Sequence, residues 1–163
     1  MKNQKGFSLV ELLVVVIIIA IIAAIAIPNL LASRRAANEA SAVSSLRSIH
    51  SAEATYQATS GANTAYGTLA ELNTAGLIDS VLSAATASAT PKSGYFFTES
   101  TVSGGSSYCV VADPVTQGLS GTGVRNFAVS GDGVIYQSSA DGTTTLAACA
   151  GDPLQASGAG PLN

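Results

Sequence analysis

Few residues of this sequence could carry out chemistry, and they are widely spaced. His50 is the only histidine, and Glu53 follows three residues later, so both could lie on one side of a helix. Two ligands are too few for a zinc site. The G-x-S-x-G, P-loop and C-x-x-C patterns do not occur in the sequence. We therefore expect both residues to be solvated on a helix face, and we predict no enzyme active site, no metal site and no cofactor.

Four aspartates, Asp113, Asp132, Asp141 and Asp152, lie beside glycine or proline in the second half of the chain. Oxygen-rich loops of this kind can bind calcium, although the spacing does not fit an EF-hand. Aspartate next to glycine or proline is more typical of turns. The sequence therefore favours turns and leaves calcium binding open.

Glu11 is the charged residue in the most unusual setting. Every residue from 12 to 27 is apolar, and Glu11 is the only charged side chain between Phe7 and Ser33. As a helix, residues 7–27 would cover roughly 30 Å, the thickness of a hydrocarbon core. A carboxylate inside a bilayer costs about 2.5 to 3.5 kcal/mol, so it needs a proton or a partner.

The composition of the 163 residues limits the class of protein. Only 10% of residues are charged and 47% are hydrophobic, which excludes disorder caused by high charge. The formal net charge of -3 argues against nucleic acid as a partner, because nucleic-acid binders present a basic surface. The length suits one domain with one extra element.

Two interpretations of the amino terminus are open. Lys2 and Lys5, the apolar run and Ala24-Ile25-Ala26 could form a secretory signal that is cleaved after Ala26. Against this interpretation, the apolar run is longer than a usual signal core and contains Glu11. The helical pattern also continues past the cleavage point, so a retained helix is favoured.

The residues MKNQKGF followed by SLVELLVVVIIIAIIAAIAIP resemble the class III signal of type IV pilins and type II secretion pseudopilins. The resemblance implies that a prepilin peptidase cleaves between Gly6 and Phe7 and that the new amino group of Phe7 is methylated. It places the family's conserved glutamate, the fifth residue of the processed chain, at Glu11. The family's helix-interrupting proline corresponds to Pro28, where loss of one backbone hydrogen bond predicts a bend or local melting.

The resemblance, closest to a type IV major pilin, implies a structural subunit. Such a subunit is held in the inner membrane as a single-pass precursor and is then polymerised by the pilus assembly machinery into an extracellular helical filament of identical chains. The amine of a neighbouring copy could pair with Glu11 and set the register. Two alternatives remain: the major pseudopilin of a type II secretion system, and a membrane-anchored binding module that does not assemble.

The sequence pattern predicts an α+β fold, in which one long helix packs against an antiparallel sheet. After residue 29 the helix becomes amphipathic and can extend to Thr59. Thr68 and Glu71 form a capping box that opens a short helix, and Gly76 ends it. The expected segments are a cleaved leader (1–6), a transmembrane or filament-core helix (7–29), the amphipathic half (30–60), a surface connecting loop (61–93), the sheet (94–139) and a carboxy-terminal loop region (140–163).

Alternating apolar residues in the last third of the chain predict the sheet. We expect four strands, at residues 95–101, 107–112, 126–130 and 134–138. Gly131-Asp132-Gly133 predicts a hairpin connection between the last two strands. Phe127 with Val129, and Val134 with Tyr136, supply apolar residues at alternate positions, so one face needs cover. The amphipathic half of the helix is the available cover.

Cys109 and Cys149 are the two cysteines of the chain. In an exported domain we expect the two cysteines to form a disulfide, and two buried thiols are the alternative. A carboxy-terminal disulfide is common among type IV pilins, so the resemblance also points to pairing. The major pseudopilins usually lack this bond.

Overall fold

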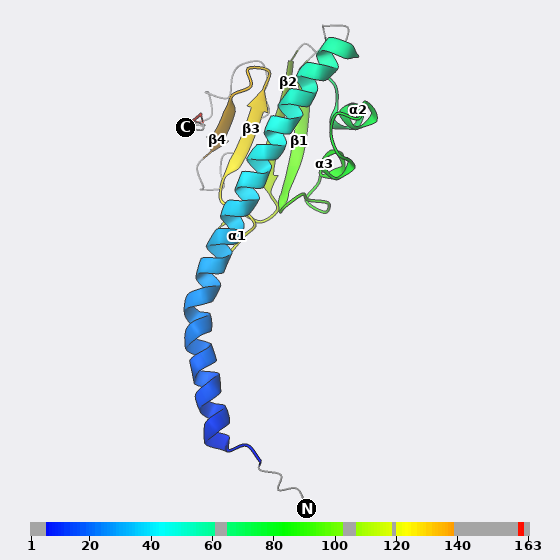
Figure 1. Cartoon of the computed structure of the whole chain (residues 1–163). Coiled ribbons are helices and arrows are strands. Elements are labelled where there is room, and N and C mark those ends of the chain that lie inside the picture. Colours follow the sequence, from blue (N-terminus) through cyan, green and yellow to red (C-terminus); the bar gives the residue numbers. More distant parts are fainter. Residues whose placement is uncertain (1–5, 61–64, 103–106, 119, 139–159, 162–163) are drawn as a thin grey trace, which may run out of the picture. The chain divides into compact units, whose positions relative to one another are not determined.

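The computed structural model describes residues 6–60, 65–102, 107–118, 120–138 and 160–161. The longest element is helix α1 (Leu9–Thr59). The chain divides into two compact units, Met1–Ser33 and Arg34–Asn163, and α1 contributes to both (Figure 1). The helix ends at the predicted residue, Thr59, and begins two residues after Phe7.

An antiparallel sheet forms the centre of the second unit, which we call the head. Its strands follow one another in chain order, and each pairs with the next. The strands are β1 (Tyr95–Val102), β2 (Ser107–Pro114), β3 (Asn126–Ser130), β4 (Ile135–Ser138) and the two-residue β5 (Gly160–Pro161). The predicted α+β fold with a four-stranded antiparallel sheet is confirmed, and β5 is an addition that the sequence pattern did not indicate.

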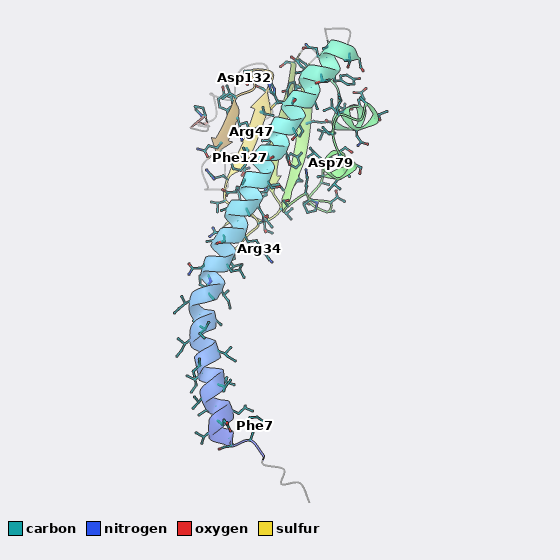
Figure 2. All side chains as sticks on the ribbon, in the orientation of Figure 1. Phe7, Arg34, Arg47, Asp79, Phe127 and Asp132 are labelled. Carbon is teal, nitrogen blue, oxygen red and sulfur yellow. The ribbon has the colours of Figure 1, made fainter. Side chains whose placement is uncertain are left out.

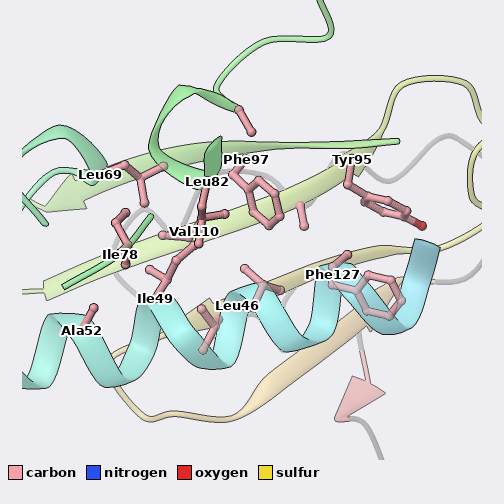
Figure 3. Close-up of a cluster of buried hydrophobic side chains, with 14 of the residues drawn as sticks. Leu46, Ile49, Ala52, Leu69, Ile78, Leu82, Tyr95, Phe97, Val110 and Phe127 are labelled. Atoms are coloured by element: carbon pink, nitrogen blue, oxygen red, sulfur yellow. The ribbon is translucent and has the colours of Figure 1, made fainter. Parts of the chain in front are cut away.

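The second half of α1 covers one face of this sheet, as predicted. Leu46 and Ile49 of α1 are fully buried and belong to the same apolar cluster as Phe97, Val110 and Phe127 of the strands (Figure 3). The cluster joins residues as far apart in the sequence as Ala42 and Ile135, so the head folds around long-range contacts. Burial of each large side chain contributes roughly 1.5 to 3 kcal/mol, which makes this cluster the main source of head stability.

The interpretation of residues 61–93 as surface is wrong for the apolar residues of two short helices, although most described residues of the range are exposed or half-buried. Two short helices, α2 (Leu69–Thr74) and α3 (Ser80–Ala84), lie here, and Leu69, Leu72 and Leu82 are at most 2% exposed. Each helix has an N-cap that fixes where it starts. The predicted capping box of Thr68 and Glu71 is confirmed for α2, and Asp79 caps α3. Once the starts are fixed, one side of each short helix faces the core.

The apolar alternation of the last hairpin is shifted by one residue from the prediction. The strand β4 begins at Ile135, because Val134 still belongs to the turn and donates its backbone N–H to Asp132. Ile135 therefore lies on the helix-covered face with Val129, while Tyr136 lies in a separate buried cluster on the opposite face. A shift of one residue reverses the face of every side chain in a strand.

Candidate assembly segment

The first unit presents an apolar surface that nothing in the described chain covers. Seventeen large apolar side chains between Phe7 and Leu31 are exposed, among them Ile18 at 51% and Ile25 at 66%. Their sticks project outward from the ribbon in Figure 2. Within the described residues, α1 is the single helix that is long and apolar enough to cross a membrane, with a mean hydropathy of 3.3 in its most apolar window. Such a surface requires an apolar environment.

Glu11 lies in the first turn of α1, at the amino-terminal end of this surface. The residue is exposed, and its neighbours in sequence, Val10 at 64% and Leu12 at 62%, are exposed as well. A carboxylate is favoured near a helix amino terminus because the unpaired backbone N–H groups there carry partial positive charge. The structure therefore places one negative group on an otherwise apolar helix surface.

Gly6 and Phe7 precede the helix. Phe7 is 85% exposed, and a Cβ atom built on Gly6 would meet nothing within 4 Å. Packing against the described residues therefore gives no reason for a glycine at position 6. Both residues are positioned where another protein could reach them.

Pro28 lies inside α1, and the helix continues through it. Of the two effects that we expected, a bend or local melting, the melting is therefore not observed. The side chain of Asn29 donates a hydrogen bond of 3.1 Å to the carbonyl of Ile25, one turn earlier. This bond supports the turn in which proline removes a backbone donor.

Comparison with known proteins agrees with this arrangement. Residues 1–27 match the family described as the prokaryotic N-terminal methylation motif. The chain therefore carries an N-terminal methylation motif. It is similar to the type IV wide pilus major component PilA4 of Thermus thermophilus, with 49% identity over 39 residues. That match covers 24% of this chain and 30% of the relative, so the chain spans about a third of the relative's length. No solved structure matches the chain.

Within the head, the expectation of solvated His50 and Glu53 is wrong. Glu53 is 2% exposed, and its carboxylate accepts a hydrogen bond of 2.9 Å from the backbone N–H of Gly67. His50 is half-buried, and its Nδ1 atom is hydrogen-bonded to the hydroxyl of Tyr108. Both residues lie at positions that continue the buried face of α1. The helical period therefore indicated burial, but their polar character led us to expect solvation.

The aspartates that the structure describes make turns and strand contacts. Asp132 accepts hydrogen bonds from Ser130 and Val134 in the β3–β4 turn, which confirms the turn interpretation there. Asp113 accepts a bond of 2.6 Å from the side chain of Asn126, and burial raises its pKa. Asp141 and Asp152 lie outside the described residues. No group of three potential metal ligands occurs in the part of the chain that is described.

An ion pair that sequence reasoning missed connects α1 to the start of β3. Glu39 is only 8% exposed, and its Oε2 atom accepts two bonds from the guanidinium of Arg125, at 2.9 Å from Nε and 2.7 Å from Nη2. The same carboxylate accepts bonds from the backbone N–H groups of Val124 and Arg125. The guanidinium also lies 5.4 Å from the ring centre of Phe127. The partners are 86 residues apart, so no local pattern could indicate them.

Cys109 is buried on β2, and Cys149 lies outside the described residues, so their disulfide stays a prediction. We expect a thiol-alkylating reagent to label neither cysteine of the exported protein under non-reducing, denaturing conditions. Closure of about 40 residues would stabilise the head by roughly 4 kcal/mol in the chain-entropy estimate. Mass spectrometry after alkylation provides the measurement, and labelling of both residues in exported protein would exclude the bond. Reduction before alkylation should expose both thiols and serves as the control.

Proposed function

We propose that this chain is a structural subunit that polymerises through the first half of α1 into a type IV pilus-like filament on the cell surface. In this proposal, the subunit waits in the inner membrane as a single-pass protein. The observation that carries the proposal is the exposed apolar surface between Phe7 and Leu31. At roughly 1.5 to 3 kcal/mol for each large side chain, covering this surface is worth tens of kcal/mol. Lipid can supply that cover before assembly, and the same helix of other copies can supply it afterwards.

Glu11 supports assembly over simple anchoring. An isolated anchor gains nothing from a carboxylate on its apolar surface, which costs about 2.5 to 3.5 kcal/mol in a bilayer. Cleavage before Phe7 would create an amine one helical turn from Glu11. In a bundle of helices, the amine of a neighbouring copy would pair with this carboxylate, and the pair would set the axial register of the subunits. The Glu11 carboxylate can be paired in two ways: with the amine of a neighbouring copy when chains associate, or with the amine of its own chain. Either pair would lower the free-energy cost of the charge in the bilayer.

Processing is the step that makes this amine available. We expect the mature protein to begin at Phe7 with one methyl group, through the action of a prepilin peptidase on the bond after Gly6. An intact-mass measurement of purified protein checks this expectation. A chain that begins at Ile27 would instead support an ordinary secretory signal.

A bulky residue at position 6 should block processing. Because a Cβ atom at Gly6 meets nothing within 4 Å, Gly6→Leu should leave the fold intact and affect only recognition by the peptidase. We expect Gly6→Leu to remain at the precursor mass in the membrane fraction. Gly6→Ala, which adds one methyl group at the same place, is the matched control and should be cleaved more completely. Complete cleavage of Gly6→Leu would show that this glycine is not a determinant of processing.

Two other functions are separated from this proposal by one experiment. Cells that express the chain are sheared, and the released material and the membranes are analysed by mass spectrometry and electron microscopy. The chain in long released filaments supports the pilus subunit. Short periplasmic assemblies that depend on a type II secretion system indicate the pseudopilin. A chain that stays monomeric in the membrane indicates the anchored binding module.

A further inference from the structure

A buried carboxyl group in the head lies at the point where the connecting segment meets α1. We call residues 65–69, which lead into α2, the α2 entry segment. Gly67 of this segment donates its backbone N–H to Glu53 of α1. A Cβ atom on Gly67 would lie 3.1 Å from the ring of Tyr56, so the segment lies directly on the helix. Glu53 thus contacts the segment at a residue where an added side chain would meet the ring of Tyr56.

Two more carboxylates bind the next two backbone groups of the segment. The N–H of Thr68 donates to Glu71 at 2.8 Å, and the N–H of Leu69 donates to Glu99 of β1. Three successive N–H groups are therefore held by carboxylates from α1, α2 and β1. In the described residues, the ion pairs are Lys92 with Asp79 and Arg125 with Glu39, so none involves these three carboxylates.

Titratable groups on α1, α2, β1 and β2 lie around Glu53. Glu99 and Glu71 repel its negative charge. The charges of Glu53 and of Tyr66 in the α2 entry segment both raise the pKa of Tyr108 on β2, and the tilted rings of the two tyrosines have centres 4.8 Å apart. His50, one turn earlier on α1, is hydrogen-bonded to the same Tyr108 hydroxyl. The charge of Asp132 in the β3–β4 turn also raises the pKa of Tyr108.

We propose that Glu53 makes the attachment of the α2 entry segment to α1 depend on protonation. Neutral Glu53 keeps the segment attached, and ionised Glu53 adds a third negative charge at a buried position and loosens it.

The electrostatics agree with this geometry. Burial, the largest cause, together with Glu99 and Glu71 raises the pKa of Glu53 from 4.5 to about 7, against the opposing effect of the Gly67 N–H. The attached state therefore binds more protons than a detached state whose carboxyl has an ordinary pKa. Attachment weakens as the pH rises from about 4.5 to about 7 and stays constant above that range.

Hydrogen exchange of the full-length protein in detergent micelles tests this proposal. The detached fraction, obtained from the exchange of the Gly67 and Leu69 amides after correction for intrinsic rates, should rise about tenfold between pH 6 and pH 8. Glu53→Gln, which is neutral at every pH, should show no such rise. Asp113→Asn removes a different, half-buried carboxyl of the head and should keep the wild-type profile.

Three results would overturn the proposal. The first is a flat profile in the wild type, and the second is a persistent rise in Glu53→Gln. The third is loss of the rise in Asp113→Asn, which would assign the effect to the stability of the whole head. Carbon-13 titration of the Glu53 carboxyl in the wild type needs no variant and should give a midpoint near pH 7. A midpoint near 4.5 would also overturn the proposal.

Discussion

Glu11→Val should abolish filaments while the head remains folded. The substitution removes the carboxylate that a neighbouring amine could meet. It also makes residence in the membrane more favourable by about 2.5 to 3.5 kcal/mol, so both changes oppose transfer into a filament. We expect processed protein to accumulate in the inner membrane, with a loss of sheared filaments of at least tenfold. Immunoblots of the sheared and membrane fractions measure this partition.

Ile18→Val is the matched control for this experiment. Ile18 lies on the same apolar helix and is 51% exposed, and the change keeps an apolar, β-branched side chain. This variant should assemble normally. Far-UV circular dichroism and protease resistance of both variants in micelles report on the head. Normal filament yield from Glu11→Val, in cells without another pilin, would leave Glu11 with no role in assembly.

Glu39→Ala should strongly destabilise the head, although the residue is polar and lies outside the apolar cluster. It leaves the guanidinium of Arg125 and the backbone N–H groups of Val124 and Arg125 without their shared acceptor. Removal of one partner from a mostly buried pair costs about 3 kcal/mol, and we take the lower end of the usual range because the Arg125 side chain is 42% exposed. Urea unfolding in micelles, followed by the near-ultraviolet circular dichroism of the tyrosines, measures the loss.

Lys92→Met provides the comparison for this loss. Lys92 forms the other ion pair, with Asp79 at 3.4 Å, and the Asp79 side chain is 57% exposed. Exposed pairs contribute about 0 to 1 kcal/mol. We therefore expect a change below about 1 kcal/mol for Lys92→Met. Equal losses in the free energy of unfolding for Glu39→Ala and Lys92→Met would contradict the expectation that Glu39 contributes more to head stability than Lys92.

Local sequence patterns predicted much of the fold. The end of α1 at Thr59, the capping box of Thr68 and Glu71, and the bounds of β3 follow from signals contained within a few residues. Such signals work because helix caps and strand alternation depend on near neighbours. The apolar run of the first unit was equally clear, since its composition alone requires an apolar environment.

Features that depend on distant residues were not predicted. Burial of Glu53 depends on the N–H of Gly67, and burial of Glu39 depends on Arg125, which is 86 positions away. The surface interpretation of residues 61–93 was wrong for Leu69, Leu72 and Leu82, because helices of six and five residues are too short for the apolar period to reveal a buried face. The face of β4 was wrong because one extra turn residue, Val134, shifts the alternation.

Electron cryo-microscopy of sheared filaments tests the central claim most directly. The filaments come from cells in which this chain is the only pilin-like protein expressed. We predict density for this chain's own side chains, with residues 9–31 of each copy in the filament interior against the same residues of other copies, and Phe7 as the first residue. Filaments made of a different protein, or a filament of this chain in which residues 9–31 lie at the surface, would contradict the proposed function.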